Sequence, residues 1–300
     1  MRFFIAGLGN SYKAWRLIAE AVPIADDLGY YGVVVPDHFM YDRSELPDRN
    51  STVDTWTAFS YLAAKTRRLM FATLVTPVPL RPPGILAKIV ATVDVLSSGR
   101  AILGVGAGWS QTEFDGYSEW SDPKTRVDKT EEGVQLIKRL WTETQVDFQG
   151  RFYKAKGAVL EPKPVQKPYP PLLFGGVSPR MLRMAGRHGD LCFIAPWVKV
   201  PFTDAKSTVE RAAEKARRSR KILFGTGAPR LQGGKFDVKA LTKDIQTAND
   251  NRCEFYVTAF PQDDYVTAFP QDDYVTAFPQ DDYVTTMKQF SREVLTSYGT

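Results

Sequence analysis

Strand-like apolar runs recur along most of the chain, and helix-like stretches separate them. Almost every run ends in a polar, glycine-rich or proline-rich motif. Eight such endings are visible, at Ala6-Gly7, Pro36-Asp37-His38, Thr76-Pro77, Gly106-Ala107-Gly108-Trp109, Gly175-Gly176, Ala195-Pro196-Trp197, Gly225-Thr226-Gly227 and Phe260-Pro261. This alternation predicts an α/β fold, a closed (β/α)8 TIM barrel. Because the loops after the strands meet at one end of such a barrel, the motifs are expected to converge on one mouth.

Length and composition agree with that fold. The 300 residues are predicted to form one barrel domain, residues 1–300, and an apolar fraction of 43% is enough for its core. The chain enters a strand pattern at once and has no membrane-spanning apolar run, so we expect a cytoplasmic protein with no membrane partner. Cys192 and Cys253 fall in predicted strands and are expected to be buried, reduced thiols. The net charge of +5 would help to attract an anionic cofactor but does not indicate nucleic acid.

Residues 145–170 interrupt the alternation. The stretch from Val146 to Tyr153 has hairpin character, and a proline-rich stretch follows it. We interpret this segment as an excursion from the barrel before strand five, and not as a second domain. Elsewhere the pattern predicts the third strand over residues 69–75, a polar loop over residues 110–125 and a helix over residues 126–141.

A nonapeptide repeat marks the end of the chain. The sequence Tyr-Val-Thr-Ala-Phe-Pro-Gln-Asp-Asp occurs at residues 256–264, 265–273 and 274–282, and a fourth start brings the repeat to residue 285. One copy is predicted to supply strand eight, which would end at Phe260-Pro261. The remaining copies are surplus to the barrel, since three copies at one end do not build a solenoid.

His38 is the first candidate for chemistry. It follows Pro36 and Asp37 at the end of a buried-type strand, and the chain has only two histidines. Asp37 and His38 together could move a proton near neutral pH, although a histidine that only caps a loop or bonds a ligand is the alternative. The other histidine, His188, lies at a predicted helix end and is interpreted as structural.

Two glycine motifs are candidates for binding. The run Gly104-Val105-Gly106-Ala107-Gly108-Trp109 would let the backbone approach a flat ligand, and Trp109 could stack on a ring or pack under its loop. Gly175 and Gly176 precede a predicted helix start, where free backbone N–H groups could hold a phosphate. A tight strand-to-helix turn is an equal explanation for the second motif.

Taken together, these motifs resemble the luciferase-like monooxygenase superfamily. The resemblance rests on Pro36-Asp37-His38-Phe39, Thr73-Leu74-Val75-Thr76-Pro77, Leu96-Ser97-Ser98-Gly99-Arg100, Gly104 to Trp109, Glu113-Phe114 and Phe174-Gly175-Gly176. It implies a (β/α)8 barrel with an excursion, and a cofactor that is FMN or coenzyme F420, the 8-hydroxy-5-deazaflavin. The motifs look closer to the deazaflavin-dependent branch.

The resemblance also implies roles for single residues. Asp37 and His38 would lie beside the cofactor ring, with His38 as proton donor or acceptor supported by Asp37. The bond between Thr73 and Leu74 would be a non-proline cis peptide that forms a bulge behind the ring. Thr76 would bond the cofactor. The ring would be lined by Gly106, Ala107, Gly108 and Trp109, and its phosphate held by Gly175 and Gly176. No metal site is predicted.

The sequence departs from the branch at two positions. The sugar-phosphate and secondary-alcohol dehydrogenases that it resembles carry Glu where Trp109 stands and Trp where Asp42 stands. A more apolar small-molecule substrate is therefore expected for the predicted F420-dependent oxidoreductase. The alternatives are an FMN-dependent monooxygenase that uses reduced flavin and oxygen, and a non-catalytic deazaflavin-binding protein. A homodimer is possible by resemblance, without an interface that the sequence identifies.

Overall fold

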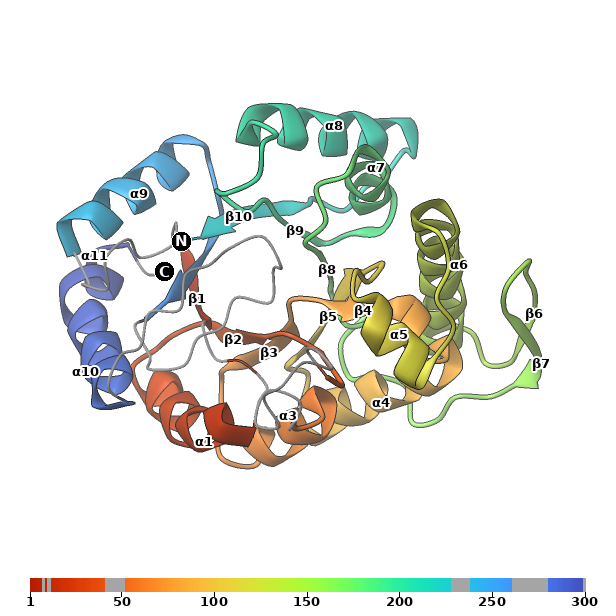
Figure 1. Cartoon of the computed structure of the whole chain (residues 1–300), viewed down its shortest axis with the longest axis horizontal. Coiled ribbons are helices and arrows are strands. Elements are labelled where there is room, and N and C mark those ends of the chain that lie inside the picture. The colour runs from red at the N-terminus through yellow and green to blue at the C-terminus, as the bar shows by residue number, and fades with distance from the viewer. Residues whose placement is uncertain (7–8, 10–11, 41–51, 228–237, 261–279, 299–300) are drawn as a thin grey trace.

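The computed structural model describes residues 1–6, 9, 12–40, 52–227, 238–260 and 280–298. Within these residues, parallel strands close a barrel that helices surround (Figure 1). The barrel strands are β1 (Arg2–Ala6), β2 (Gly32–Val35), β3 (Met70–Thr73), β5 (Ala101–Gly106), β8 (Leu172–Phe174), β9 (Leu191–Phe193), β10 (Leu223–Gly227) and β11 (Phe255–Ala259). Pairing of β1 with β11 and of β3 with β5 closes the ring. The predicted (β/α)8 barrel is confirmed.

Helices follow the strands and cover the outside of the barrel. They are α1 (Tyr12–Asp27), α3 (Thr55–Ala63), α4 (Pro83–Leu96), α5 (Gln111–Tyr117), α6 (Pro123–Thr142), α7 (Pro179–His188), α8 (Phe202–Lys215), α9 (Val238–Asp250), α10 (Gln280–Phe290) and α11 (Thr296–Tyr298). A two-residue strand, β4 (Thr76–Pro77), pairs with the end of β5, and the 3-10 turn η1 (Val78–Leu80) leads toward α4. A π-helical turn (Ser291–Leu295) joins α10 to α11.

Large aromatic rings fill the inside of the barrel opposite glycines. Phe4 is in register with Gly32 on the neighbouring strand, and Phe255 is in register with Gly225. A Cβ at Gly32 would lie 2.5 Å from the Phe4 ring, and a Cβ at Gly225 would lie 2.2 Å from the Phe255 ring. The two rings meet edge to face with centroids 5.8 Å apart. The interior is therefore a packed core and not a channel, as small barrels require.

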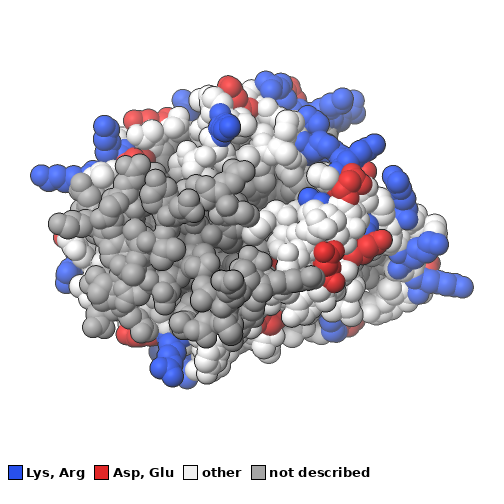
Figure 2. Space-filling view, viewed as in Figure 1, with Lys and Arg blue, Asp and Glu red and all other residues white. Residues whose placement is uncertain are grey.

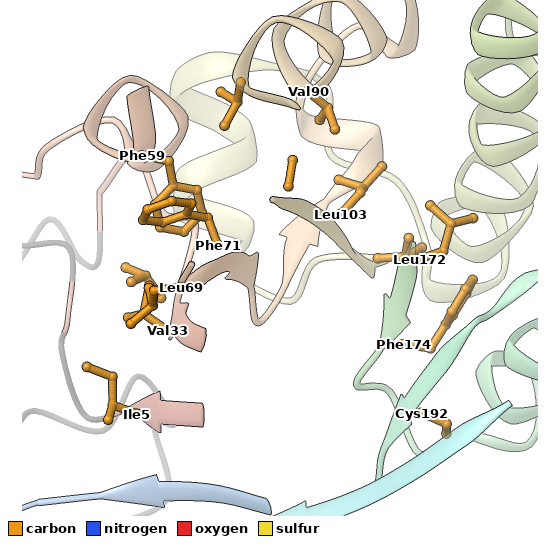
Figure 3. Packing of buried hydrophobic residues seen from close by; sticks show 14 of the residues in the cluster. Ile5, Val33, Phe59, Leu69, Phe71, Val90, Leu103, Leu172, Phe174 and Cys192 are labelled. Atoms are coloured by element: carbon orange, nitrogen blue, oxygen red, sulfur yellow. The ribbon is translucent and has the colours of Figure 1, made fainter. Parts of the chain in front are cut away.

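A second, larger core lies between the barrel and the helices. Outward-facing strand residues such as Val33, Leu103 and Phe174 pack against helix residues such as Phe59 and Val90 (Figure 3). Cys192 belongs to this layer, and its thiol is buried and free, as is that of Cys253. Burial raises the pKa of both thiols to about 12, so they stay protonated near neutral pH.

The excursion before the fifth barrel strand is a hairpin. Strands β6 (Val146–Gln149) and β7 (Lys154–Ala158) pair antiparallel between α6 and β8, at the edge of the molecule (Figure 1). The Glu132 carboxylate on α6 accepts hydrogen bonds from the backbone N–H groups of Arg151, Phe152 and Tyr153, at 2.9, 2.8 and 2.7 Å. One partly exposed carboxylate thus fixes the hairpin turn to α6. The predicted hairpin in the excursion is confirmed. The prediction that the chain forms a single domain stays a prediction.

Several element boundaries differ from the prediction. The third strand is shorter than residues 69–75, because it leaves the barrel wall after Thr73. The helix expected over residues 126–141 begins at Pro123, where the Asp122 side chain accepts from the backbone N–H groups of Lys124 and Thr125. The polar loop expected over residues 110–125 contains helix α5. The first repeat copy supplies β11 as expected, whereas residues 265–273 lie outside the described residues.

Charge gathers at the edge of the molecule. In Figure 2 the Lys and Arg side chains project mostly from the periphery of the view, and the described surface nearer its middle is mostly uncharged. On this face the described positive side chains therefore lie mostly at the rim and do not gather near its middle. Among the described residues, the helices are too short or too polar to cross a membrane.

Candidate functional site

A bulge follows β3 at the mouth of the barrel. The peptide bond between Leu74 and Val75 is cis, so the prediction that placed it between Thr73 and Leu74 is wrong by one residue. The reason lies in the strand ladder. Thr73 pairs with Val35, and the Leu74 N–H still donates to the Val35 carbonyl at 2.9 Å. The first peptide bond beyond the ladder is therefore the one that follows Leu74.

Glycines on the neighbouring strands seat this bulge. A Cβ at Gly106, at the end of β5, would lie 2.4 Å from Val75 Cγ2. A Cβ at Gly175, after β8, would lie 3.0 Å from Leu74 Cδ1 and 3.1 Å from Val75 Cγ1. Both glycines are thus explained by close packing against the bulge, which does not require that they touch a ligand.

The mouth surface beside the bulge is small and apolar. Leu74, Val75 and Ala107 are each partly exposed, as are Gly175 and Gly176, and they come from the ends of β3, β5 and β8. Strands β3 and β8 both pair with β5, so these ends are neighbours in the barrel. We name these five residues the mouth platform. A platform of this kind can accept the face of a flat, uncharged ring.

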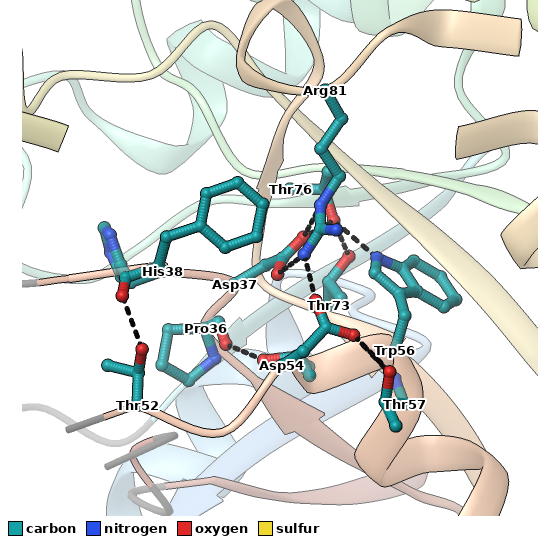
Figure 4. Close-up of polar contacts among 12 residues, drawn as sticks. Pro36, Asp37, His38, Thr52, Asp54, Trp56, Thr57, Thr73, Thr76 and Arg81 are labelled. Carbon is teal, nitrogen blue, oxygen red and sulfur yellow. Dashed lines mark hydrogen bonds and ion pairs between the residues drawn. The ribbon is translucent and has the colours of Figure 1, made fainter. Parts of the chain in front are cut away.

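Asp37 is buried and forms an ion pair with Arg81. The Asp37 side chain is only 1% exposed and forms a two-pronged ion pair, with Arg81 Nη2 at 2.8 Å from Oδ1 and Nε at 3.2 Å from Oδ2. Arg81 also donates to Asp54 Oδ2 at 2.6 Å, and its guanidinium lies 4.3 Å from the centre of the Phe39 ring. Figure 4 shows Arg81 between the two carboxylates. The charge of Asp37 is therefore neutralised inside the protein.

Thr76 extends this network. Its hydroxyl donates to Asp37 Oδ2 at 2.8 Å and accepts from the Trp56 indole N–H at 3.2 Å. The Thr73 hydroxyl lies 3.0 Å from that of Thr76 and accepts from the Gly104 N–H at 3.0 Å (Figure 4). The Thr76 side chain is fully buried and bonds Asp37, and its contact with a cofactor stays a prediction.

His38 pairs with a different carboxylate. Its Nδ1 lies 3.1 Å from Glu113 Oε2, while Glu113 Oε1 accepts from the Phe39 N–H at 2.6 Å. His38 is 8% exposed and Glu113 is 1% exposed. The structure therefore does not give His38 the support from Asp37 that the sequence suggested, because Arg81 and Thr76 occupy Asp37. Glu113 takes that place.

Trp109 stands at the outer edge of this pair. Its indole meets the His38 ring edge to face, with centroids 5.7 Å apart, and it is 40% exposed. Gly108 precedes it with a positive φ of 78°, and a Cβ there would lie 2.4 Å from the Phe114 ring. Only glycine suits that position, for both reasons. The turn at Gly108 thus directs Trp109 toward His38 and into contact with solvent.

Gly175 and Gly176 lie between β8 and α7, as predicted. Ser178 caps the helix, because its hydroxyl accepts from the Met181 N–H. A Cβ at Gly176 would lie 3.1 Å from Met181. The turn is tight, and it presents the N-terminal end of a ten-residue helix at the mouth.

Sequence reasoning did not identify the pairing of Glu113 with His38, or the ion pairs of Arg81 with Asp37 and Asp54. Ser110-Gln111-Thr112-Glu113 has the Ser-x-x-Glu pattern of a capping box, which would have predicted the start of α5. The Ser110 hydroxyl does accept from the Glu113 N–H, at 3.3 Å. The Glu113 carboxylate, however, reaches the loop after β2 instead of closing the box. Asp54 caps α3, where one of its oxygens accepts from the Thr57 N–H at 2.8 Å, and its other oxygen bonds Arg81.

The second histidine lies outside the mouth. His188 Nε2, at the end of α7, lies 3.3 Å from Glu131 Oε1 on α6, and Arg187 bonds the same carboxylate. The hydrogen bond from His188, with that from Arg187, lowers the pKa of Glu131 to about 2. This pair ties α6 to α7, which agrees with the structural role inferred for His188.

Comparisons with known proteins agree with this architecture. The model of the luciferase-like monooxygenase family matches residues 1–230. The monooxygenase RslO1 from Streptomyces bottropensis is 21% identical, with a TM-score of 0.76 over 100% of both chains. An F420-dependent secondary alcohol dehydrogenase, solved with an F420–acetone adduct, is 18% identical, with a TM-score of 0.76 over 98% of both chains.

A third similar structure covers less of each chain. The coenzyme F420-dependent tetrahydromethanopterin reductase from Methanopyrus kandleri is 22% identical, with a TM-score of 0.61 over 76% of this chain and 65% of that one. At these identities the three structures support the fold, and the family match extends over most of the chain. The chain belongs to the luciferase-like monooxygenase family.

Proposed function

We propose that this protein is an oxidoreductase that transfers hydride between coenzyme F420 and a small organic substrate, with His38 as the proton donor or acceptor. The observation that carries the proposal is the mouth platform, a small, apolar surface bordered by one buried, carboxylate-paired histidine. The preference for deazaflavin is supported by the sequence motifs and by the likeness to an F420-dependent dehydrogenase over 98% of both chains.

The residues at the mouth fit a flat cofactor ring. The partly exposed residues of the platform carry no charge and no long side chain, so a planar ring could approach the backbone closely. Gly175 and Gly176 precede the N-terminal end of α7, where backbone N–H groups would favour the phosphate of the cofactor. When bound, a deazaflavin supplies two-electron hydride chemistry that no side chain can supply.

His38 would manage the proton. Moving a hydride to or from an alcohol, enone or imine leaves one proton to be transferred, and imidazole can carry it near neutral pH. Asp37 does not compete for this role, because Arg81 and Thr76 already bond both of its oxygens. Asp37 and Arg81 instead brace the loop that carries His38, which keeps the ring in one place.

Trp109 and Tyr117 suggest the kind of substrate. Trp109 contacts His38 edge to face, and Tyr117 packs on Phe39, with ring centroids 4.9 Å apart. Both aromatic side chains are substantially exposed, at 40% and 59%. Rings at the entrance favour an apolar or aromatic substrate over a sugar phosphate, since they offer contact area and no anion-binding charge.

The proposal is tested by binding and turnover together. Fluorescence titrations with F420 and, in parallel, with FMN should show micromolar or tighter binding of F420 and much weaker binding of FMN. His38→Ala should lower kcat by about 10²–10⁴-fold for alcohols, enones or imines while the Kd for F420 changes little. His188→Ala is the matched control and should leave both unchanged.

The other outcomes discriminate between the alternatives. Preference for FMN with oxygen consumption would replace the proposal with a flavin monooxygenase. Tight F420 binding without turnover across the substrate classes would favour a non-catalytic deazaflavin-binding protein. Unchanged turnover in His38→Ala would remove His38 from the mechanism.

A further inference from the structure

The two histidines of the chain present opposite ring nitrogens to a glutamate. His38 faces Glu113 through Nδ1 at 3.1 Å, whereas His188 faces Glu131 through Nε2 at 3.3 Å. In a neutral imidazole only one nitrogen carries the proton, and the hydrogen-bond partner decides which one. The contacts therefore assign opposite tautomers to the two rings.

The Glu113 carboxylate is fixed before it meets His38. Its Oε1 is held by the Phe39 N–H at 2.6 Å, and its backbone is held by the Ser110 cap of α5. The side chain is only 1% exposed. Phe39 is the residue next to His38, so the two oxygens of the Glu113 carboxylate contact two consecutive residues of the loop after β2.

Among the described residues, Glu113 is the carboxylate that pairs with His38. Asp37 comes from the same loop, but its charge is offset by the two-pronged contact with Arg81. Arg81 itself is shared between Asp37 and Asp54. From the β5 side, Trp109 contributes an uncharged ring and α5 contributes Glu113. Among the described ion pairs, the only cationic partner of Glu113 is His38.

We propose that Glu113 is a positioning residue that fixes His38 as the Nδ1–H tautomer, leaving Nε2 as the nitrogen that exchanges a proton during turnover. Its catalytic meaning rests on the proposed function, but the tautomer itself does not. A buried carboxylate that bonds Nδ1–H orients the ring and stabilises the imidazolium, as an aspartate does in a Ser-His-Asp triad.

The first test reads the rings directly in the unmodified protein. With only two histidines in the chain, long-range ¹H–¹⁵N correlation spectra of protein labelled with ¹⁵N-histidine contain two imidazoles, and His188→Gln assigns them. At a pH where both rings are neutral, we expect Nδ1–H for His38 and Nε2–H for His188. An Nε2–H tautomer at His38 would overturn the proposal, whether or not the protein binds F420.

The second test changes the charge and keeps the shape. Glu113→Gln should let the Nε2–H tautomer of His38 appear in the same spectra, because an amide can present either its oxygen or its N–H group to Nδ1. Glu131→Gln is the matched control and should alter only the His188 ring. A His38 ring that stays entirely Nδ1–H in Glu113→Gln would contradict the proposal.

Kinetics then connect the ring to the reaction. In Glu113→Gln kcat should fall about tenfold or more, because the His38 ring is no longer held in one tautomer, while the Kd for F420 is kept. Glu113→Asp should recover part of the loss. If Glu113→Gln does not fold by circular dichroism, the tautomer in the unmodified protein still decides. If F420 is not bound at all, the proposed function fails while the tautomer result stands.

Discussion

The same tripeptide, Tyr-Val-Thr, folds in two ways within this chain. At Tyr256 to Thr258 it is the middle of strand β11, paired with β1 and β10. At Tyr283 to Thr285 it lies in helix α10. Both tyrosines are completely buried, at 0% exposure. The first threonine is buried, whereas the second is exposed. Identical residues thus reach the core through two different backbones.

The difference follows from side-chain periodicity and from the residues that come next. In the strand, alternate residues face opposite sides, so Tyr256 joins the outer core and Val257 joins the barrel interior. In the helix, Tyr283 and Val284 both face the outer core. Pro261 stands three residues after Thr258, where a helix interior would not accept it, whereas Thr286 to Phe290 continue α10 without proline. Local propensity therefore does not decide the structure of this tripeptide.

Truncating the tyrosines gives the largest expected effect. Tyr256→Ala and Tyr283→Ala should each lower the free energy of unfolding by about 3–5 kcal/mol, because each empties a fully buried aromatic site. Tyr283 also meets Phe260 of the first copy edge to face, with ring centroids 5.3 Å apart. Urea denaturation followed by circular dichroism measures both losses. A cost below about 1 kcal/mol for Tyr283→Ala would show that the helical copy is not packed as described.

Removing only the tyrosine hydroxyls should change stability differently at Tyr256 and at Tyr283. The Tyr283 hydroxyl donates to the Ala6 carbonyl at 2.7 Å, whereas the Tyr256 hydroxyl is buried without a hydrogen-bond partner in the described part of the chain. Tyr283→Phe should therefore cost about 1 kcal/mol. Tyr256→Phe should be neutral or stabilising by up to about 1 kcal/mol, because an unpaired buried hydroxyl is removed. The free energies of unfolding of the two variants are compared by urea denaturation, provided that their m-values are equal. Equal changes in the two variants would contradict the hydrogen bonding described for the two hydroxyls.

The barrel could be predicted from the sequence because its strands are buried on both sides. Such strands are continuous apolar runs that end where the ladder ends, and that pattern is local. The end of β3 was predicted two residues too late and the cis bond one residue too early, because the Leu74 N–H still bonds Val35 and the bulge begins only after it. In the nonapeptide repeat the sequence could not show which copy forms the last barrel strand, since every copy has the same strand-like pattern.

The site could be predicted only as a set of positions. Asp37 and His38 were placed at the mouth by their position after a strand, and they do lie there. Their partners could not be identified, because Glu113 is 75 residues from His38 and Arg81 is 44 residues from Asp37. No local pattern records such pairings. Glu113 and not Asp37 pairs with His38, because Arg81 forms an ion pair with Asp37. That arrangement exists only in the folded chain.

Substitutions of Thr258 and Thr285 give the smallest expected changes in stability, and the direction of the change at Thr258 is the informative result. The Thr258 hydroxyl is buried without a hydrogen-bond partner in the described residues, and Thr285 is exposed on α10. Thr258→Val fills nearly the same space without an unpaired hydroxyl, so it should stabilise the protein by about 1 kcal/mol. Thr285→Val should change stability by less than about 0.5 kcal/mol, since both residues have similar helix propensities and the site is exposed. Urea midpoints of the two variants, measured side by side, test the pair. Destabilisation by Thr258→Val would mean that the hydroxyl of the strand copy has a partner in solution, and the contrast between the two copies would then rest on their backbones alone.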